Sequence, residues 1–188
     1  MLDDYLTEAR VGRLMSEDAT EDERYRLVAK AFGPALNRLA KAYEADPDLR
    51  LDLLQDIHVA LWRSLARFDE RCALRTWVYR VAHNVGASHI VRQRSHLSRL
   101  TTLADIEVAT AELTPEDSAG DRQALDRLMA MIHRLKPPDR QVMLLYLEDV
   151  EAAAIAEVTG LSPGAVAVRV HRAKALLARD FPKGGQGD

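Results

Sequence analysis

The run from Leu74 to Arg99 restricts the fold more than any other part of the chain, because its pattern fits a helix. Its apolar residues form one stripe at helical spacing: Leu74, Trp77, Val78, Val81, Ala82 and Val85. The opposite face is predicted to carry Thr76, Arg80, His83 and Arg94, with Tyr79 and Asn84 at its margins. No acidic residue occurs between Arg71 and Asp105. A polar face of one sign, with aromatic residues and an Asn, favours binding of a polyanion. A solvated surface helix with Trp77 in the core is the plain alternative.

The remaining sequence predicts an all-α fold. Runs of alternating β-branched residues, which would signal strands, are essentially absent. The segment from Leu100 to Gly120 is rich in Thr, Ala, Asp and Glu and has little helical period and no obvious core face. We therefore predict two small helical domains, residues 1–99 and 121–188, joined by a flexible linker at residues 100–120.

Two further helices are predicted in the first domain. Thr20, followed by three acids, is a good N-cap for the first, and the Gly33-Pro34 pair is expected to kink or divide it. The second runs from Leu49 to Phe68 after an Asp46-Pro47-Asp48 start, with its apolar residues on one side. Near its N-terminal end the polar side carries Asp52, Gln55 and Asp56.

A helix-turn-helix is predicted near the C-terminus. A short helix ends at Gly160, which can take the positive φ of a tight turn, and Ser162 caps a second helix that has Pro163 at its first position. The segment from Val158 to Arg179 contains no acid, and this layout is typical of DNA binding in the major groove. A plain helical hairpin within a bundle is the alternative.

Charge and cysteine content narrow the class of protein. The net charge is −3, so the chain as a whole is not basic. Its basic residues are instead concentrated in the two acid-free segments, Arg71 to Ala104 and Val158 to Arg179, which are predicted to form basic surfaces. The single cysteine, Cys72, excludes an internal disulfide and a thiolate zinc cage. No signal peptide is recognised, and no apolar stretch reaches the roughly 20 residues of a membrane span. We expect a cytoplasmic protein that does not insert into membranes, has no metal site or cofactor, and has no catalytic residues of its own.

The chain resembles the extracytoplasmic-function (ECF) sigma factors of bacterial RNA polymerase, over roughly Tyr25 to Phe181. The run DLLQDI at Asp52 is similar to the family's polymerase-docking helix, and WVYRVAHN at Trp77 is similar to its promoter-melting helix. LKPPDRQV at Leu135, Gly160-Leu-Ser and RVHRAK at Arg169 resemble the family's second domain. The resemblance implies a transcription initiation factor with core RNA polymerase (β′ clamp and β subunit) and promoter DNA as partners. An anti-sigma factor is a further candidate partner.

By this resemblance, each domain has its own binding residues. Core polymerase would contact Asp52, Leu53, Gln55 and Asp56. The minus-ten element would contact Arg75, Trp77, Tyr79, Arg80, His83, Asn84, Ser88, Arg92 and Arg94, and the loop from Phe68 to Thr76 would accept a flipped base. The minus-thirty-five element would contact Ser162, Gly164, Ala165, Arg169, His171, Arg172 and Lys174.

The recognition helix departs from the family pattern, because Ala165, Ala167 and Val168 stand where Thr, Lys and Ser are usual. Alanine and valine side chains offer no hydrogen bond to base edges. Upstream binding is therefore predicted to rest on phosphate contacts and to be weakly specific.

Two alternative functions remain open on the sequence. A sigma-like interaction protein would bind polymerase or a regulator without reading promoters, and the alanines of the recognition helix favour it. A plain helix-turn-helix regulator would leave the Asp52 motif and the Trp77 helix unexplained.

Overall fold

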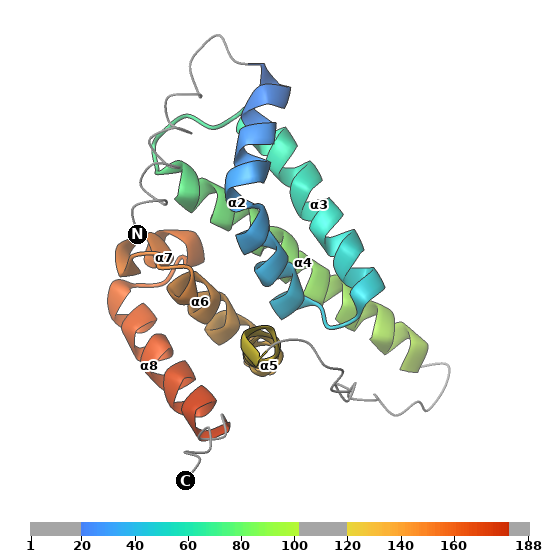
Figure 1. Ribbon diagram of the computed structural model, residues 1–188, viewed down its shortest axis with the longest axis vertical. Coiled ribbons are helices and arrows are strands. Elements are labelled where there is room, and N and C mark those ends of the chain that lie inside the picture. Colours follow the sequence, from blue (N-terminus) through green and yellow to red (C-terminus); the bar gives the residue numbers. More distant parts are fainter. Residues whose placement is uncertain (1–19, 102–119, 181–188) are drawn as a thin grey trace. The chain divides into compact units, whose positions relative to one another are not determined.

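A computed structural model describes residues 20–101 and 120–180, apart from the side chains of residues 96–101, 120–123 and 180. Within this part the fold is all-α, as predicted, with seven helices and no strand (Figure 1). The chain divides into two compact units, residues 1–115 and 116–188. Each unit is described by itself.

Within residues 20–101 the first unit has three helices that all pack on one another: α2 (Glu21–Tyr43), α3 (Pro47–Leu65) and α4 (Leu74–Thr101). The predicted helix starts are confirmed. Thr20 and Glu23 form a capping box, in which each side chain satisfies the other residue's backbone N–H. The Asp46 carboxylate accepts from the first free N–H groups of α3, at 2.9 and 3.0 Å, and Pro47 occupies the first helical position.

The core of this unit lies between the three helices. A row at four-residue spacing on α3, comprising Leu53, Ile57, Leu61 and Leu65, is at most 1% exposed. Each of these leucine and isoleucine side chains contributes about 1.5–3 kcal/mol of hydrophobic stabilisation when fully buried. Apolar residues of α2 and α4 complete the core, among them Val28, Leu36, Leu39, Val78 and Ala82.

The boundaries differ from the sequence prediction in three places. The Gly33-Pro34 pair does not divide α2, and the Asn37 side chain donates to the Gly33 carbonyl at 2.9 Å. The second helix ends at Leu65 rather than Phe68. The first two residues of the predicted linker belong to α4 and the last, Gly120, begins α5, while the rest of that linker lies outside the described residues.

The second unit contains α5 (Gly120–His133), α6 (Pro137–Leu147), α7 (Ala152–Thr159) and α8 (Pro163–Asp180). Its core is contributed by all four helices: Met129, Ile132, Val142, Leu145, Ile155, Val158, Val166 and Ala173. The guanidinium of Arg140, 7% exposed, donates to the carbonyls of His133 and Leu135. Arg140 therefore satisfies the carbonyl of the last residue of α5 and a carbonyl of the turn that follows it.

The predicted helix-turn-helix is present in α7 and α8. Gly160 ends α7 in the left-handed conformation, with φ of 71°, and the Ser162 hydroxyl accepts from the Ala165 N–H at 3.2 Å. The chain bends by 101° between the two helices, within the usual range of this motif. No single helix in the described part is long and apolar enough to cross a membrane, and α7 with α8 reaches that length and composition only as this bent pair.

One close contact holds α2 against α4. A Cβ built on Gly86 would lie 2.9 Å from the Tyr43 ring, which is 3% exposed and hydrogen-bonded to His83. Since the ring is held on two sides, it has little room to move away. Gly86 is thus the position of α4 at which the Tyr43 ring leaves no room for a side chain.

We expect Gly86→Val to lower the free energy of unfolding of the first unit by about 1–3 kcal/mol through overpacking. Urea denaturation followed by tryptophan fluorescence measures this directly, because both tryptophans lie in the first unit. Ala87→Val, at the exposed neighbouring position, is the control and should cost no more than about 0.7 kcal/mol. Equal losses in the two variants would contradict the close packing at Gly86.

Candidate promoter and polymerase interfaces

The prediction of which residues form the nucleic-acid face of α4 is wrong in part. The sequence pattern predicts Thr76, Tyr79 and His83 on or beside the exposed side, but these residues are only 4%, 2% and 1% exposed. The reason is that α4 packs against both α2 and α3, so a wider arc of its surface is covered than one apolar stripe predicts. Tyr79 and His83 are therefore part of the core, and we withdraw both as DNA contacts.

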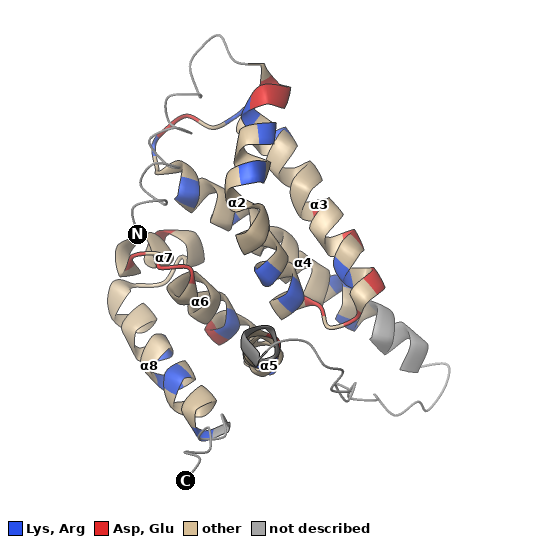
Figure 2. Ribbon diagram, in the orientation of Figure 1, with Lys and Arg blue, Asp and Glu red and all other residues tan. Residues whose placement is uncertain are grey.

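The outer face of α4 is a continuous stripe without an acid. It runs through Asn84, Ala87, Ser88, Val91, Arg92, Arg94 and Ser95, all of them exposed. Toward the N-terminal end the half-buried Arg75, Trp77 and Arg80 extend it. Figure 2 shows only basic charges along the described part of α4. Seven of the nine residues predicted to bind the minus-ten element thus lie on accessible or half-buried parts of one helix.

Trp77 stands at the junction of α4 with the preceding loop. Its indole N–H donates to the Ser64 hydroxyl at 3.2 Å, and its ring centroid lies 5.5 Å from that of Phe68. Glu70, in the loop between Phe68 and Trp77, adopts a positive φ of 59°. The hydrogen bond and ring contact fix the indole in place while part of its surface stays accessible.

His83 forms the polar centre of the α2–α4 contact. Its Nδ1 lies 2.9 Å from the Tyr43 hydroxyl, and its Nε2 has no hydrogen-bond partner among the described residues. Burial away from water disfavours the charged imidazolium and lowers the pKa of His83 from 6.5 to about 3. The histidine is therefore neutral in the folded protein near pH 7.

The outer face of α3 combines carboxylates with apolar side chains. Asp52, Gln55 and Asp56 are exposed, as the docking prediction requires. Leu53, predicted with them, is 0% exposed because it belongs to the core stripe, so it is corrected from a contact to a core residue. Besides Leu49 (40% exposed) in the first turn, three apolar side chains that the sequence analysis assigns to no site also reach the surface of α3: Leu51 (65% exposed), Val59 (39%) and Trp62 (41%).

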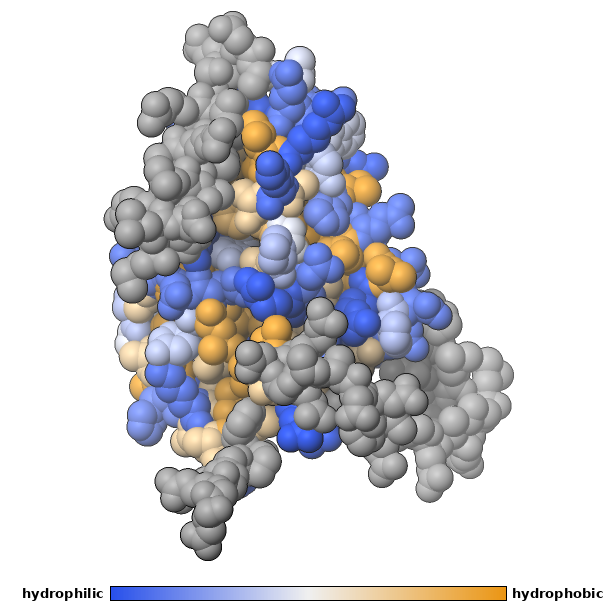
Figure 3. All heavy atoms as spheres, viewed as in Figure 1, coloured by the Kyte–Doolittle hydropathy of each residue, from blue (hydrophilic) through white to orange (hydrophobic). Residues whose placement is uncertain are grey.

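In the sequence these three residues form a second apolar series, in which Val59 and Trp62 follow Leu51 by eight and eleven residues, close to whole helical turns. Figure 3 shows hydrophobic residues at the surface on the α3 side of the first unit, among hydrophilic ones. The outer face of α3 can therefore bury apolar surface against a partner as well as offer it negative charge.

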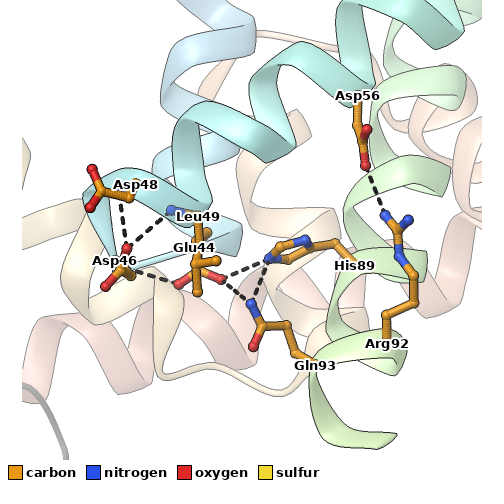
Figure 4. A network of polar contacts seen from close by, with 8 residues as sticks. All are labelled: Glu44, Asp46, Asp48, Leu49, Asp56, His89, Arg92 and Gln93. Atoms are coloured by element: carbon orange, nitrogen blue, oxygen red, sulfur yellow. Dashed lines mark hydrogen bonds and ion pairs between the residues drawn. The ribbon is translucent and has the colours of Figure 1, made fainter. Parts of the chain in front are cut away.

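Three polar contacts join α4 to α3 and to the C-terminal end of α2, at one end of the unit (Figure 4). Arg92 on α4 donates to the Asp56 carboxylate on α3 at 3.0 Å. Glu44, at the end of α2, accepts from Gln93 at 3.1 Å and lies 2.7 Å from Nε2 of His89. These contacts bridge residues 36–49 positions apart in sequence.

Three basic residues of α8 contact side chains of α6. Arg169 and Arg172 both donate to Asp139 of α6, at 2.6 and 3.2 Å, and the Asp139 side chain is 4% exposed. Lys174 donates to the Tyr146 hydroxyl at 2.5 Å. Three of the basic residues predicted to contact the minus-thirty-five element are thus held along the α6 side of α8. The predicted Ser162, Gly164 and His171 are exposed, Ala165 is half-buried, and Val168, absent from the predicted set, is 68% exposed.

No group of three or more His, Cys, Asp or Glu residues in the described part of the chain is arranged to hold a metal ion.

The neutral His83 predicts that the first unit loses stability in acid. The unfolded chain binds a proton below about pH 6.5, whereas the folded chain resists it down to a pKa of about 3. Unfolding at pH 5 should therefore require about 2 kcal/mol less than at pH 7 from this residue alone.

His83→Asn, which does not titrate and can still bond Tyr43, should lose most of this pH dependence in urea titrations at the two pH values. His171→Asn changes an exposed histidine of the second unit and should leave the pH dependence of the first unit unchanged. An identical pH dependence of wild type and His83→Asn would show that His83 does not control it.

Comparison with known proteins identifies both units. Residues 28–96 match the family model "Sigma-70 region 2", and residues 125–177 match "Sigma-70, region 4". The chain is 34% identical over 166 residues to the RNA polymerase sigma factor CnrH of Cupriavidus metallidurans, covering 81% of this chain and 83% of CnrH. It is 23% identical to the ECF RNA polymerase sigma factor SigW of Bacillus subtilis, covering 87% of this chain and 86% of SigW.

The fold is also similar to that of a solved sigma factor. The sigma factor RpoE in a co-crystal structure with the anti-sigma factor NepR, from Bartonella quintana, superposes with a TM-score of 0.66 at 20% identity. The match covers 86% of this chain and 98% of RpoE. On the two region matches and the identity to CnrH, the chain belongs to the sigma-70 family, as an extracytoplasmic-function RNA polymerase sigma factor that directs transcription initiation.

Proposed function

We propose that the first unit uses two different faces for its two tasks, α3 for core polymerase and α4 for the minus-ten element. The observation that carries this is the contrast between the faces. The outer face of α3 presents exposed carboxylates and apolar side chains, whereas the outer stripe of α4 contains no acid. A basic protein surface complements the first, and a polyanionic single strand complements the second.

On α4, the proposed contacts are the accessible or half-buried residues: Arg75, Trp77, Arg80, Asn84, Ser88, Arg92 and Arg94. The Asn84 side chain can hydrogen-bond a base edge, and the Trp77 ring can stack on a base. Arg92 already donates to Asp56, so on binding DNA its guanidinium must either leave this carboxylate or contact the carboxylate and a phosphate together. The Asp56–Arg92 pair is exposed, so exchanging it for a phosphate contact costs little.

In the second unit, α8 is proposed to lie in the major groove of the minus-thirty-five element. The N-terminal end of a helix favours phosphate, and the acid-free surface adds to this attraction. The chain itself performs no catalytic step in this proposal, since the polymerase forms the phosphodiester bonds. Its proposed place of action is the cytoplasm.

A protein regulator is a further proposed partner. RpoE was crystallised with an anti-sigma factor, and CnrH with the cytosolic domain of CnrY. In this chain the exposed Leu51, Val59 and Trp62 offer such a partner the same surface that we assign to the polymerase. A regulator bound there would compete with core polymerase.

The direct test of the whole proposal is transcription in vitro with core polymerase, the full chain and a genomic DNA library. Discrete start sites that depend on the chain are expected. Binding to core polymerase without any new start site would instead favour a sigma-like interaction protein.

We expect Asp52→Arg to weaken binding to core polymerase by at least about tenfold, because like charges facing each other at an interface cost several kcal/mol. The folding stability should change by only about 0.5 kcal/mol, since Asp52 is exposed. Titration of labelled chain with core polymerase measures the affinity. Glu21→Arg makes the same charge change at an exposed site on α2 and should leave core affinity intact. Unchanged affinity of Asp52→Arg would remove α3 from the docking surface.

For the melting face, Asn84→Ala should preserve core binding and reduce open-complex formation about five- to 100-fold, the loss expected for one base contact. Permanganate footprinting of unpaired thymines reports melting directly. Asn37→Ala makes the same change at an exposed position of α2 and should melt promoters normally. Wild-type melting by Asn84→Ala would contradict the role of this face.

A further inference from the structure

Val168 is the most exposed large hydrophobic residue in the described part of the chain, at 68%. It lies on the outer face of α8, together with the exposed Gly164, Ala167 and His171. The opposite face of α8 buries Val166, Ala173 and Leu177. The folding of the second unit therefore does not account for a valine at position 168.

The surroundings of Val168 contain few hydrogen-bonding groups. No side chain from Pro163 to Val168 carries a donor or acceptor. The nearest cations of the helix are held by other groups, Arg169 and Arg172 by Asp139 and Lys174 by Tyr146. The part of α8 that would enter a groove first is thus apolar, while the charge lies further along the helix.

In the major groove of DNA, the C5-methyl of thymine is the apolar group among base edges that otherwise present donors and acceptors. An exposed valine at the groove floor gains by covering such a methyl group and cannot recognise the polar edges. Building on the proposed placement of α8, we propose that Val168 reads thymine methyl groups in the upstream promoter element. Recognition there is then apolar and specific for the methyl group, rather than only a matter of phosphate contacts.

Duplex DNA is the occupant that fits this face best. The helix follows a helix-turn-helix bend of 101°, its first turn is capped by Ser162, and its sequence to Arg179 has no acid to repel phosphates. A protein partner on Val168 is the competing possibility, and the experiment below distinguishes the two.

The experiment uses holoenzyme made from core polymerase and the full chain, on a promoter found with the genomic library. Selection from a pool with a randomised upstream hexamer should enrich thymine at one or more positions, on either strand. Replacing each enriched thymine by deoxyuridine then removes only the methyl group. We expect about fourfold weaker binding at a thymine that Val168 covers, the value for losing one buried methyl-sized group.

Val168→Ala should bind the thymine and deoxyuridine promoters almost equally. Leu125→Ala is the matched control, because Leu125 is 41% exposed on α5, outside the helix-turn-helix and both proposed faces of the first unit, and this variant should keep the fourfold difference. Normal thermal unfolding of Val168→Ala is expected, because the side chain is exposed.

Three results would overturn the inference. A selected hexamer without thymine, or one whose thymines tolerate deoxyuridine in wild type, shows that no methyl group is read. A deoxyuridine loss that persists in Val168→Ala assigns the reading to another residue. Weaker core binding by Val168→Ala without any methyl effect assigns the face to a protein. With any of these results, chain-dependent start sites on the genomic library would still support the proposed function. Absence of such start sites would contradict both the proposed function and the inference about Val168.

Discussion

The packing of α4 against α2 at Gly86, Tyr43 and His83 determines what the first unit can present to its partners. Because Gly86 has no side chain, the Tyr43 ring lies directly on the α4 backbone and its hydroxyl reaches Nδ1 of His83. This contact turns Thr76, Tyr79 and His83 inward. The stripe through Asn84 and Ser88 stays exposed and is the face that we propose for DNA. This proposed face is therefore a consequence of core packing, not of the charge pattern alone.

Local signals in the sequence predicted much of the fold. Thr20, Asp46 and Ser162 are N-caps, and Gly160 has the positive φ of the turn, because capping and left-handed backbone depend on residues close in the chain. The burial of His83 was not predicted, since its hydrogen-bond partner Tyr43 lies forty residues away and cannot be inferred from the neighbouring sequence.

The same limit explains what the sequence did not predict about the site. The sequence predicts Asp56 and Arg92 on two separate binding surfaces, one for polymerase and one for DNA. In the structure they form an ion pair between α3 and α4. In the second unit, Arg169 and Arg172 appeared as phosphate contacts, but the buried Asp139 holds both. Each unit thus pairs some of its basic residues with its own acids. Exposed apolar residues, Leu51 and Val59 on α3 and Val168 on α8, therefore enter the proposed interfaces beside the charged residues.

The central claim is that α3 faces polymerase while α4 faces promoter DNA. Site-specific photo-crosslinking in the open complex tests it most directly, with a benzophenone amino acid at Val59 or at Ser88, both exposed. We predict that the Val59 position crosslinks to a polymerase subunit and the Ser88 position to the non-template strand of the minus-ten element. Crosslinking of Ser88 to polymerase only, or of Val59 to DNA, would contradict this division of the two faces.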